Sequence, residues 1–278
     1  MPSSSQAPLS LVIAGAAGRM GQAVIRAALT GPGFEVIGAL EHAGNAAIGV
    51  DLGPLVGLPG IGVQVTDEAL PLVAKADAIV DFSTPEASLA LADLAAQARI
   101  VHVCGTTGFT PAQEARLRAA ARHATLIKSG NMSLGVNLLA ALVEQAARAL
   151  PGFDIEIVEM HHNRKVDAPS GTALLLGDAA ALGRGKTLAD IKTQTREGQT
   201  GPRESGTIGF ASLRGGTVVG EHHVYLAGTG ERLTLSHMAE DRGIFAAGAL
   251  HAARWGQGRG PGLFSMRDVL NLAPGALI

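Results

Sequence analysis

The sequence has few residues of several types, and each shortage narrows the class of protein. Cys104 is the only cysteine among 278 residues, which excludes an intramolecular disulfide and a structural zinc site built from several cysteines. A chain with a single thiol suits a reducing cytoplasm. Aromatic residues make up only 3% of the chain and charged residues 17%, whereas 47% are apolar. We therefore expect one large domain or two smaller ones with an aliphatic core.

Long hydrophobic runs and an excess of either charge are also missing. The formal net charge is −2, so nothing at the level of the whole chain attracts nucleic acid or an anionic membrane. The opening MPSSSQAP has no basic region, and the LSLVIAGAAG that follows is too short and too interrupted by glycine for a signal helix or membrane span. We expect small-molecule partners, no nucleic acid and no membrane segment.

The first half alternates between β-type and α-type patterns. Apolar runs predict strands at Leu9–Gly15, Phe34–Leu40, Ala78–Phe82, Arg99–Val103 and Ala124–Gly130. Helical patterns lie between them at Met20–Leu29, Pro85–Gln97 and Pro111–Ala121. Strands that are apolar on both sides and separated by helices predict a parallel sheet covered on both faces. This is an α/β, Rossmann-type doubly wound fold.

The pattern changes after Pro151. FDIEIVEMHH predicts a strand, a helix is expected near Thr172–Leu182, and residues 207–238 alternate as in an antiparallel sheet. These features indicate a C-terminal α+β domain with a mixed or antiparallel sheet. A last helix near Asp241–Trp255 is expected to pack back on the first domain. We place the first domain at residues 1–132 and 241–278 and the second at 133–240.

The motif GAAGRMG, residues 15–21, joins the first strand to the first helix. Glycines there permit a tight turn whose amides can meet a pyrophosphate, although small residues in a turn can also serve helix packing alone. Glu41 ends the second strand, where a carboxylate accepts hydrogen bonds from the adenosine ribose and favours NAD. His42 and Arg19 could instead pair with a 2′-phosphate, so NAD and NADP both remain open.

Two more small loops follow strands, GTTG at residues 105–108 and SGNMS at 129–133. Both lie at the carboxyl edge of the predicted sheet, where open α/β folds bind ligands. They could offer backbone groups to a nicotinamide carboxamide, or they could be ordinary turns. We expect Cys104, beside the first loop, to be a buried small apolar residue rather than a nucleophile.

The densest chemistry lies in HHNRKVDAPSGTA, residues 161–173. Neighbouring side chains on a strand point to opposite faces, so His161 and His162 would not share an ion, and we expect no metal site. One of these histidines could donate a proton near neutral pH, and Lys165 could hold an anion or stabilise negative charge. A solvated basic loop is the alternative interpretation.

The rest of this segment suits an anion. Ser170 can cap the following helix, so that the amides around Gly171, Thr172 and Ala173 face a bound anion. The segment therefore indicates a site for a small carboxylate whose reaction needs a proton beside a hydride. A second histidine pair, at residues 222–223, alternates along a probable strand, and we interpret both as sheet residues.

Five ordered motifs resemble those of the 4-hydroxy-tetrahydrodipicolinate reductase family, also called dihydrodipicolinate reductase. They are GAAGRMG, GTTGF, NMSLGVN, EMHHNRKVDAPSGTA and RGGTVVGEHHVYLAGTGERLTLSHMAEDR, and they span almost the whole chain. The resemblance implies reduction of a cyclic, conjugated dicarboxylic imine by NADH or NADPH in the diaminopimelate route to lysine. It also implies a homotetramer assembled through the C-terminal domain, with the first domain binding the dinucleotide and the second the substrate.

The resemblance also assigns residues. It implies that His161 is the acid/base and Lys165 the second catalytic residue, and that the substrate contacts are His162, Gly171 and Thr172. The cofactor positions that it implies are Gly15, Ala16, Ala17, Gly18, Arg19, Met20, Glu41, His42, Gly105, Thr106, Thr107, Ser129, Gly130, Asn131 and Met132. Many members of the family carry arginine where His42 stands, an aromatic residue in place of Met132 and alanine or proline in place of Gly130.

Two other functions share parts of this pattern. A different two-domain Rossmann oxidoreductase, acting on a sugar or a semialdehyde, would share the first half, so the second half discriminates. A nucleotide sensor that binds NAD(P) without turnover would keep residues 15–21 but would not need HHNRK.

Overall fold

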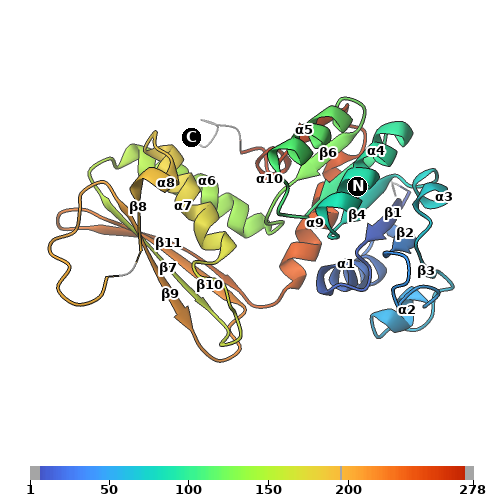
Figure 1. Ribbon diagram of the computed structural model, residues 1–278, viewed down its shortest axis with the longest axis horizontal. Coiled ribbons are helices and arrows are strands. Elements are labelled where there is room, and N and C mark those ends of the chain that lie inside the picture. Colours follow the sequence, from blue (N-terminus) through green and yellow to red (C-terminus); the bar gives the residue numbers. More distant parts are fainter. Residues whose placement is uncertain (1–6, 195, 273–278) are drawn as a thin grey trace, which may run out of the picture. The chain divides into compact units, whose positions relative to one another are not determined.

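The computed structural model describes residues 7–194 and 196–272, so residues 1–6 of the opening MPSSSQAP segment lie outside the description. The described chain forms two compact units (Figure 1). The first contains the residues up to Leu134 together with those from Gly243 onward, and the second is Gly135–Arg242. Among the described residues, none of the helices has both the length and the apolar character needed to span a membrane.

The first unit is built on a seven-stranded sheet in which every neighbouring pair of strands is parallel. Its strands are β1 (Leu9–Ala14), β2 (Phe34–Leu40), β3 (Val65–Thr66), β4 (Ala78–Asp81), β5 (Val101–Cys104), β6 (Thr125–Lys128) and β12 (Gly262–Phe264). They lie in the order β12-β6-β5-β4-β1-β2-β3, which reverses direction next to β1 as in a doubly wound dinucleotide-binding sheet. The predicted Rossmann-type fold is confirmed.

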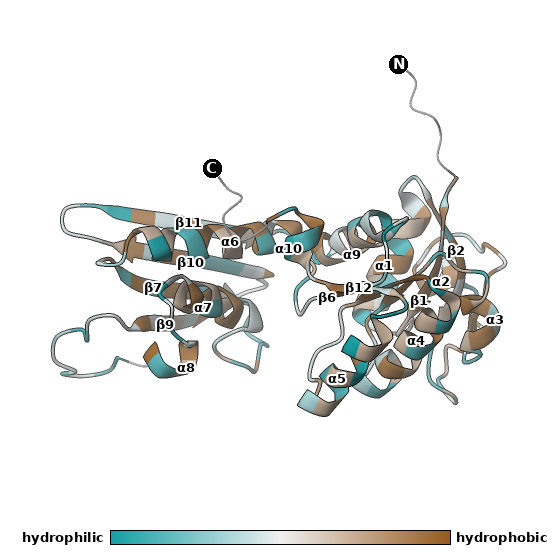
Figure 2. Cartoon of the chain, turned by 90° about the horizontal axis from the view of Figure 1, so that it is seen from above, coloured by the Kyte–Doolittle hydropathy of each residue, from teal (hydrophilic) through white to brown (hydrophobic). Residues whose placement is uncertain are grey.

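Helices cover both faces of this sheet because its strands are apolar on both sides. They are α1 (Arg19–Thr30), α2 (Leu52–Leu55), α3 (Ala69–Val73), α4 (Pro85–Ala98), α5 (Pro111–Ala120), α9 (Gly243–Gly256) and α10 (Met266–Val269). Leu11 and Ile13 of β1 pack in a cluster with α1 and α9, whereas Val12 packs in a second cluster with α4 and α5. Figure 2 shows apolar strands such as β6 and β12 beside helices with more polar surfaces.

Local chemistry sets where the helices begin and end. Thr84 and Thr110 cap α4 and α5, each followed by a proline that cannot donate a backbone hydrogen bond and suits the first helical position. The predicted strand Arg99–Val103 starts too early, because Arg99 adopts a left-handed conformation, with φ of 57°, and ends α4. The strand begins at Val101 instead.

The second unit is a mixed five-stranded sheet covered on one face by helices. Its strands are β7 (Asp154–His161), β8 (Lys192–Gln194), β9 (Ile208–Arg214), β10 (Gly220–Ala227) and β11 (Arg232–Ala239), in the order β11-β10-β7-β9-β8. Its helices are α6 (Leu134–Ala149), α7 (Gly171–Gly183) and α8 (Leu188–Ile191). The sheet is mixed because the chain crosses from β7 through α7 before it returns, which makes β9 parallel to β7, whereas β10 is antiparallel to both neighbours.

One glycine ties the last long helix to the sheet edge. Gly248 of α9 lies so close to the backbone carbonyl of the buried Met132 that a Cβ atom would overlap the carbonyl oxygen. The loop that follows β6 therefore packs directly against the backbone of α9.

We predict that Gly248→Ala destabilises the protein by about 1–3 kcal/mol, because the added methyl group overpacks this contact. Helix propensity alone would predict a gain of up to about 1 kcal/mol for the same change. Urea unfolding measures the difference, with Ala247→Gly at the adjacent exposed position as the propensity control. A more stable Gly248→Ala protein would contradict the packing argument.

Candidate functional site

The glycine loop between β1 and α1 is shaped by close backbone contacts. Gly15 has a positive φ of 76°, and a Cβ there would lie 2.5 Å from the carbonyl oxygen of Phe82. A Cβ on Gly21 would overlap the carbonyl oxygen of Gly15. α1 begins after Gly18, which has no side chain to cap it, and no acidic residue stands in the first turn. The amides of this turn can therefore receive an anion such as a pyrophosphate.

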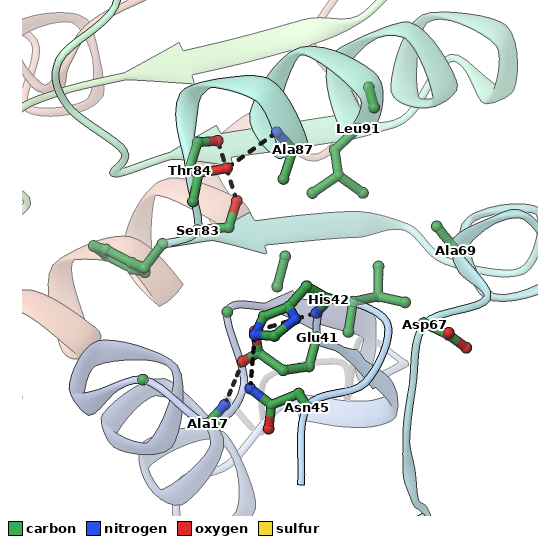
Figure 3. A pocket seen from close by; sticks show the side chains of 16 residues that line it. Ala17, Glu41, His42, Asn45, Asp67, Ala69, Ser83, Thr84, Ala87 and Leu91 are labelled. Carbon is green, nitrogen blue, oxygen red and sulfur yellow. Dashed lines mark hydrogen bonds between the residues drawn. The ribbon is translucent and has the colours of Figure 1, made fainter. Parts of the chain in front are cut away.

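A pocket of about 540 Å³ opens beside this loop (Figure 3). Glu41, at the end of β2, reaches the glycine loop and accepts a hydrogen bond of 2.9 Å from the amide of Ala17. Asn45 holds the imidazole of His42 at 3.2 Å, and Asp67 supplies a second carboxylate to the lining. An apolar wall completes the pocket with Leu40, Ala69, Ala87, Ala90 and Leu91. Carboxylates beside an apolar slot suit a nucleoside with free ribose hydroxyls.

The other two predicted loops lie at the same edge of the sheet. The loop of Gly105, Thr106 and Thr107 follows β5, and Thr106 is buried, with its hydroxyl 2.9 Å from that of Ser88 on α4. The loop of Ser129, Gly130, Asn131 and Met132 follows β6, and the amide of Ser129 donates to the carbonyl of Cys104. A Cβ on Gly130 would lie 3.7 Å from the Thr107 side chain, so the two loops adjoin. The structure thus gathers these segments at the carboxyl edge.

The remaining predicted cofactor residues lie in or next to the glycine loop. Ala16 is fully buried and donates its amide to the carbonyl of Leu40, which fixes the loop to β2. Arg19 and Met20 form the first turn of α1. Each residue of the predicted cofactor set therefore stands in one of three loops, in that turn or at the end of β2.

A buried aspartate on β4 and a buried histidine on β5 contact each other, and no local sequence pattern indicates this pair. Nε2 of His102 donates to Asp81 at 3.1 Å, and both side chains are fully buried. Burial alone would raise the pKa of Asp81, but the hydrogen bonds from His102 and Ser83 outweigh burial and lower it. Burial raises the pKa of the neighbouring Cys104 to about 11. That thiol stays neutral, as expected for a buried apolar residue.

The second unit places its titratable groups on one face of β7. Alternation along the strand puts Glu159 and His161 on the face that α7 covers, with side chains 1% and 11% exposed. Nδ1 of His161 is 2.5 Å from a carboxylate oxygen of Glu159. Arg214 of β9 donates to both oxygens of this carboxylate at 2.9 Å. Burial would raise the pKa of Glu159, but the hydrogen bonds from Arg214 and its neighbours lower it to about 2.

His222 lies beside this group, which the sequence interpretation missed. It stands on β10 opposite Glu159, with its ring 5.1 Å from that of His161 and nearly perpendicular to it. Its Nε2 is 2.9 Å from the hydroxyl of Ser170. Burial, together with the charge of His161, lowers the pKa of His222 to about 4, so this imidazole is neutral near pH 7. His223 bonds to Ser236 on the opposite face of the sheet.

The turn after β7 carries the predicted lysine. Lys165 donates to both oxygens of Asp167 at 2.8 and 2.9 Å, and its amide donates to the carbonyl of His162. Arg214 donates to the backbone carbonyl of Asp167 at 2.7 Å. The same guanidinium therefore holds both Glu159 and the turn that presents Lys165.

The start of α7 completes this group. Ser170 caps the helix by accepting from the amide of Ala173 at 3.1 Å, and its own amide donates to Glu159 at 3.2 Å. Gly171 and Thr172 follow in the first turn. A Cβ on Gly171 would meet no protein atom within 4 Å, so the glycine leaves open space at the start of the helix. A carboxylate could bind at these amides.

Comparison with known proteins agrees with this division of chemistry. Two family models match, "Dihydrodipicolinate reductase, N-terminus" over residues 9–132 and "Dihydrodipicolinate reductase, C-terminus" over residues 135–270. The 4-hydroxy-tetrahydrodipicolinate reductase 1 of Mesorhizobium japonicum is 63% identical over 267 residues, covering 95% of this chain and 98% of that protein. The reductase of Parvibaculum lavamentivorans is 62% identical, covering 96% of this chain and 99% of its own.

A solved structure is similar as well. Dipicolinate-bound dihydrodipicolinate reductase from Paenisporosarcina sp. TG-14 matches with a TM-score of 0.75 and 25% identity, over 93% of this chain and 97% of that one. The two family models together cover both units of the present structure. The chain therefore belongs to the dihydrodipicolinate reductase family and is an NAD(P)H-dependent oxidoreductase.

Proposed function

We propose that this chain reduces 4-hydroxy-tetrahydrodipicolinate to tetrahydrodipicolinate with NADH or NADPH, with loss of the hydroxyl group as water, in the diaminopimelate route to lysine. The names of the relatives, which match almost the whole chain, support this reaction over a sugar or semialdehyde oxidoreductase and over a nucleotide sensor. The observation that carries it is the buried pair of Glu159 and His161 beside the open start of α7. This arrangement places a proton donor next to a site for an anion.

The first unit fits a dinucleotide. Glycines at positions 15 and 21 bring the backbone close to where a pyrophosphate would bind, and the uncapped turn Arg19–Gly21 supplies amides. Glu41 would accept hydrogen bonds from the adenosine ribose, with His42 beside it. The loops at residues 105–107 and 129–132 would then hold the nicotinamide end. When bound, the reduced nicotinamide supplies the hydride.

His161 is the residue that we assign as proton donor. Its Nδ1 is engaged by Glu159, so Nε2 is the nitrogen that can deliver a proton to a ring carbon of the substrate after hydride has added to the conjugated ring. Lys165 would exchange its contact with Asp167 for a substrate carboxylate and balance developing charge. His162 and the amides of Gly171 and Thr172 would orient the ring.

The nucleotide pocket offers more negative than positive charge. Glu41 and Asp67 are both in the lining, and His42 is the nearest basic group in it. A 2′-phosphate would meet two carboxylates, whereas a ribose hydroxyl can donate to them. We infer that NADH is used at least as well as NADPH.

We also propose a homotetramer assembled through the second unit, in the cytoplasm. The face of the second sheet that carries Met160 and Tyr225 is opposite to the face covered by α6 and α7. On this face Leu213 is 50% exposed and Met238 61% exposed, in one row across the sheet with Met160 and Glu221, so exposed apolar side chains are available to another copy of the chain. The single, buried cysteine suits a reducing compartment.

We predict that His161→Gln lowers kcat by a factor of about 10²–10⁴, because a positioned general acid contributes about that much. Nicotinamide binding should change little, since His161 belongs to the second unit. A coupled assay with freshly generated substrate gives kcat, and fluorescence titration with NADH gives the dissociation constant. An unchanged kcat would remove His161 from this role.

We predict that His42→Arg raises kcat/KM for NADPH by about tenfold or more, because a guanidinium makes charge-assisted hydrogen bonds to a phosphate. The value for NADH should stay within about twofold, which makes NADH the internal control. The same assay, run with each nucleotide in turn, measures both. If NADPH use does not improve, the 2′-phosphate does not lie beside residue 42.

We predict that Leu213→Asp lowers the assembly state, because it places a charge at an exposed apolar position on the proposed interface face of the second sheet. Sedimentation velocity should show a tetramer for the unchanged chain and smaller species for the variant. Leu182→Asp, at the end of α7 and 54% exposed, is the matched control and should remain tetrameric. A Leu213→Asp tetramer would exclude this face as the interface.

A further inference from the structure

We propose that Glu159 is a positioning residue for proton transfer. Its ionised carboxylate fixes the tautomer and orientation of His161, and Arg214 keeps that carboxylate in place. The inference rests on the proposed role of His161 as proton donor. It assigns a function to Glu159 and Arg214, neither of which we propose to contact the reacting atoms or the cofactor.

The hydrogen bonds around Glu159 define which nitrogen of His161 carries a proton. Glu159 is almost fully buried and accepts hydrogen bonds from both Nη atoms of Arg214 and from the amide of Ser170. A carboxylate that accepts from these groups is an acceptor toward His161 as well. Nδ1 of His161, at 2.5 Å, must therefore be protonated. This leaves Nε2 to exchange a proton with a ligand.

The space around Nε2 agrees with this assignment. A Cβ on Gly220 of β10 would come within 3.0 Å of Nε2 of His161. Glycine at position 220 therefore leaves room beside Nε2, the nitrogen that we propose to transfer the proton. The hydrogen-bonded side of the ring faces Glu159, and the side with room faces away from it.

The carboxylate of Glu159 contacts the His161 ring directly. Other titratable or charged groups close to this pair are Arg214 on β9, His222 on β10, and His162, Arg164, Lys165 and Asp167 in the turn that follows β7. The pKa of Glu159, about 2, keeps this carboxylate charged near neutral pH. Removing that charge would take away the anion that an imidazolium at position 161 contacts directly.

Arg214 also helps to position Lys165, through Asp167. Besides the carboxylate of Glu159, it holds the carbonyl of Asp167, whose carboxylate holds Lys165. A single guanidinium thus sets the geometry of both the proton donor and the cation. A purely structural ion pair would stabilise the sheet without this connection, so the experiment must separate the two roles.

The chain contains a matched control on the same strand. Glu156 of β7 points to the opposite face and is paired with Arg196 and Arg203 at 2.8–3.0 Å. Glu156→Gln therefore removes a carboxylate from a comparable arginine pair on the same strand. It does so without touching His161.

The test compares Glu159→Gln, Glu156→Gln, His161→Gln and the double variant Glu159→Gln/His161→Gln, each as the full-length chain. We expect Glu159→Gln to lower kcat by about 10–100-fold, by analogy with the loss seen when the hydrogen-bond partner that orients a metal-bound histidine is removed. KM for NADH should stay within about twofold. The alkaline limb of kcat should move to lower pH, and the solvent deuterium isotope effect on kcat should rise, because proton transfer becomes slower.

The controls decide between positioning and structural support. Glu156→Gln should keep the kcat, pH profile and isotope effect of the unchanged chain. The double variant should lose no more activity than His161→Gln, because the two residues act as one unit. A Glu159→Gln enzyme with the pH profile and isotope effect of Glu156→Gln, or additive losses in the double variant, would overturn the proposal.

A measurement without turnover separates this inference from the proposed function. In ¹⁵N-detected NMR of the unchanged chain, the neutral His161 ring should be protonated at Nδ1. Predominant protonation at Nε2 would refute the positioning role even if no Glu159 variant folds. If His161→Gln stays fully active while the Nδ1 tautomer is found, the function assigned to His161 fails and the geometry of the pair stands.

Discussion

The second unit is organised around one buried negative charge. The carboxylate of Glu159 has almost no access to water, and an isolated charge in that position would be costly. Arg214 removes most of that cost through two hydrogen bonds, and the amide of Ser170 adds another. These three hydrogen bonds come from two residues, one on β9 and one at the start of α7. Strand, helix start and lysine turn are therefore fixed around one carboxylate, and His161 takes its orientation from it.

The first unit uses a comparable device beneath its loops. Asp81 accepts hydrogen bonds from His102 on the next strand and from Ser83, which lines the nucleotide pocket. In both units a buried acid at the end of a strand accepts from an imidazole and from the backbone or hydroxyl of the following segment. Hydrogen bonds of this kind hold short loops in place where few apolar side chains are available to do so. This suits a chain with little aromatic content.

Local patterns predicted much of the fold and part of the site. The strand at Phe34–Leu40 and the start of α4 at Pro85 were found because apolar runs and capping residues are local signals. Arg99 was misassigned, since its left-handed backbone depends on how α4 ends. The two-residue strand β3 and the edge strand β12 were missed because they are too short to show a period.

The site divides in the same way. Residues 161–173 drew attention because their chemistry is contiguous in sequence. Arg214 and His222 did not, since only the pairing of β7 with β9 and β10 brings them beside Glu159. Asp67 reaches the nucleotide pocket through β3, which had no sequence signal. The sequence therefore predicts the residues that act on a ligand, but not the neighbours that set their charge environment and orientation.

The return of α9 to the first unit affects the order in which the chain can fold during synthesis. Ala246, Ala249 and Ala253 are buried against the sheet face that α1 also covers. A ribosome has therefore made all six strands from β1 to β6 long before the helix that completes their apolar cover emerges. The inserted segment Gly135–Arg242 contains all of its own strands and helices and can close earlier. In this protein the part encoded in the middle is free to mature before the part encoded first.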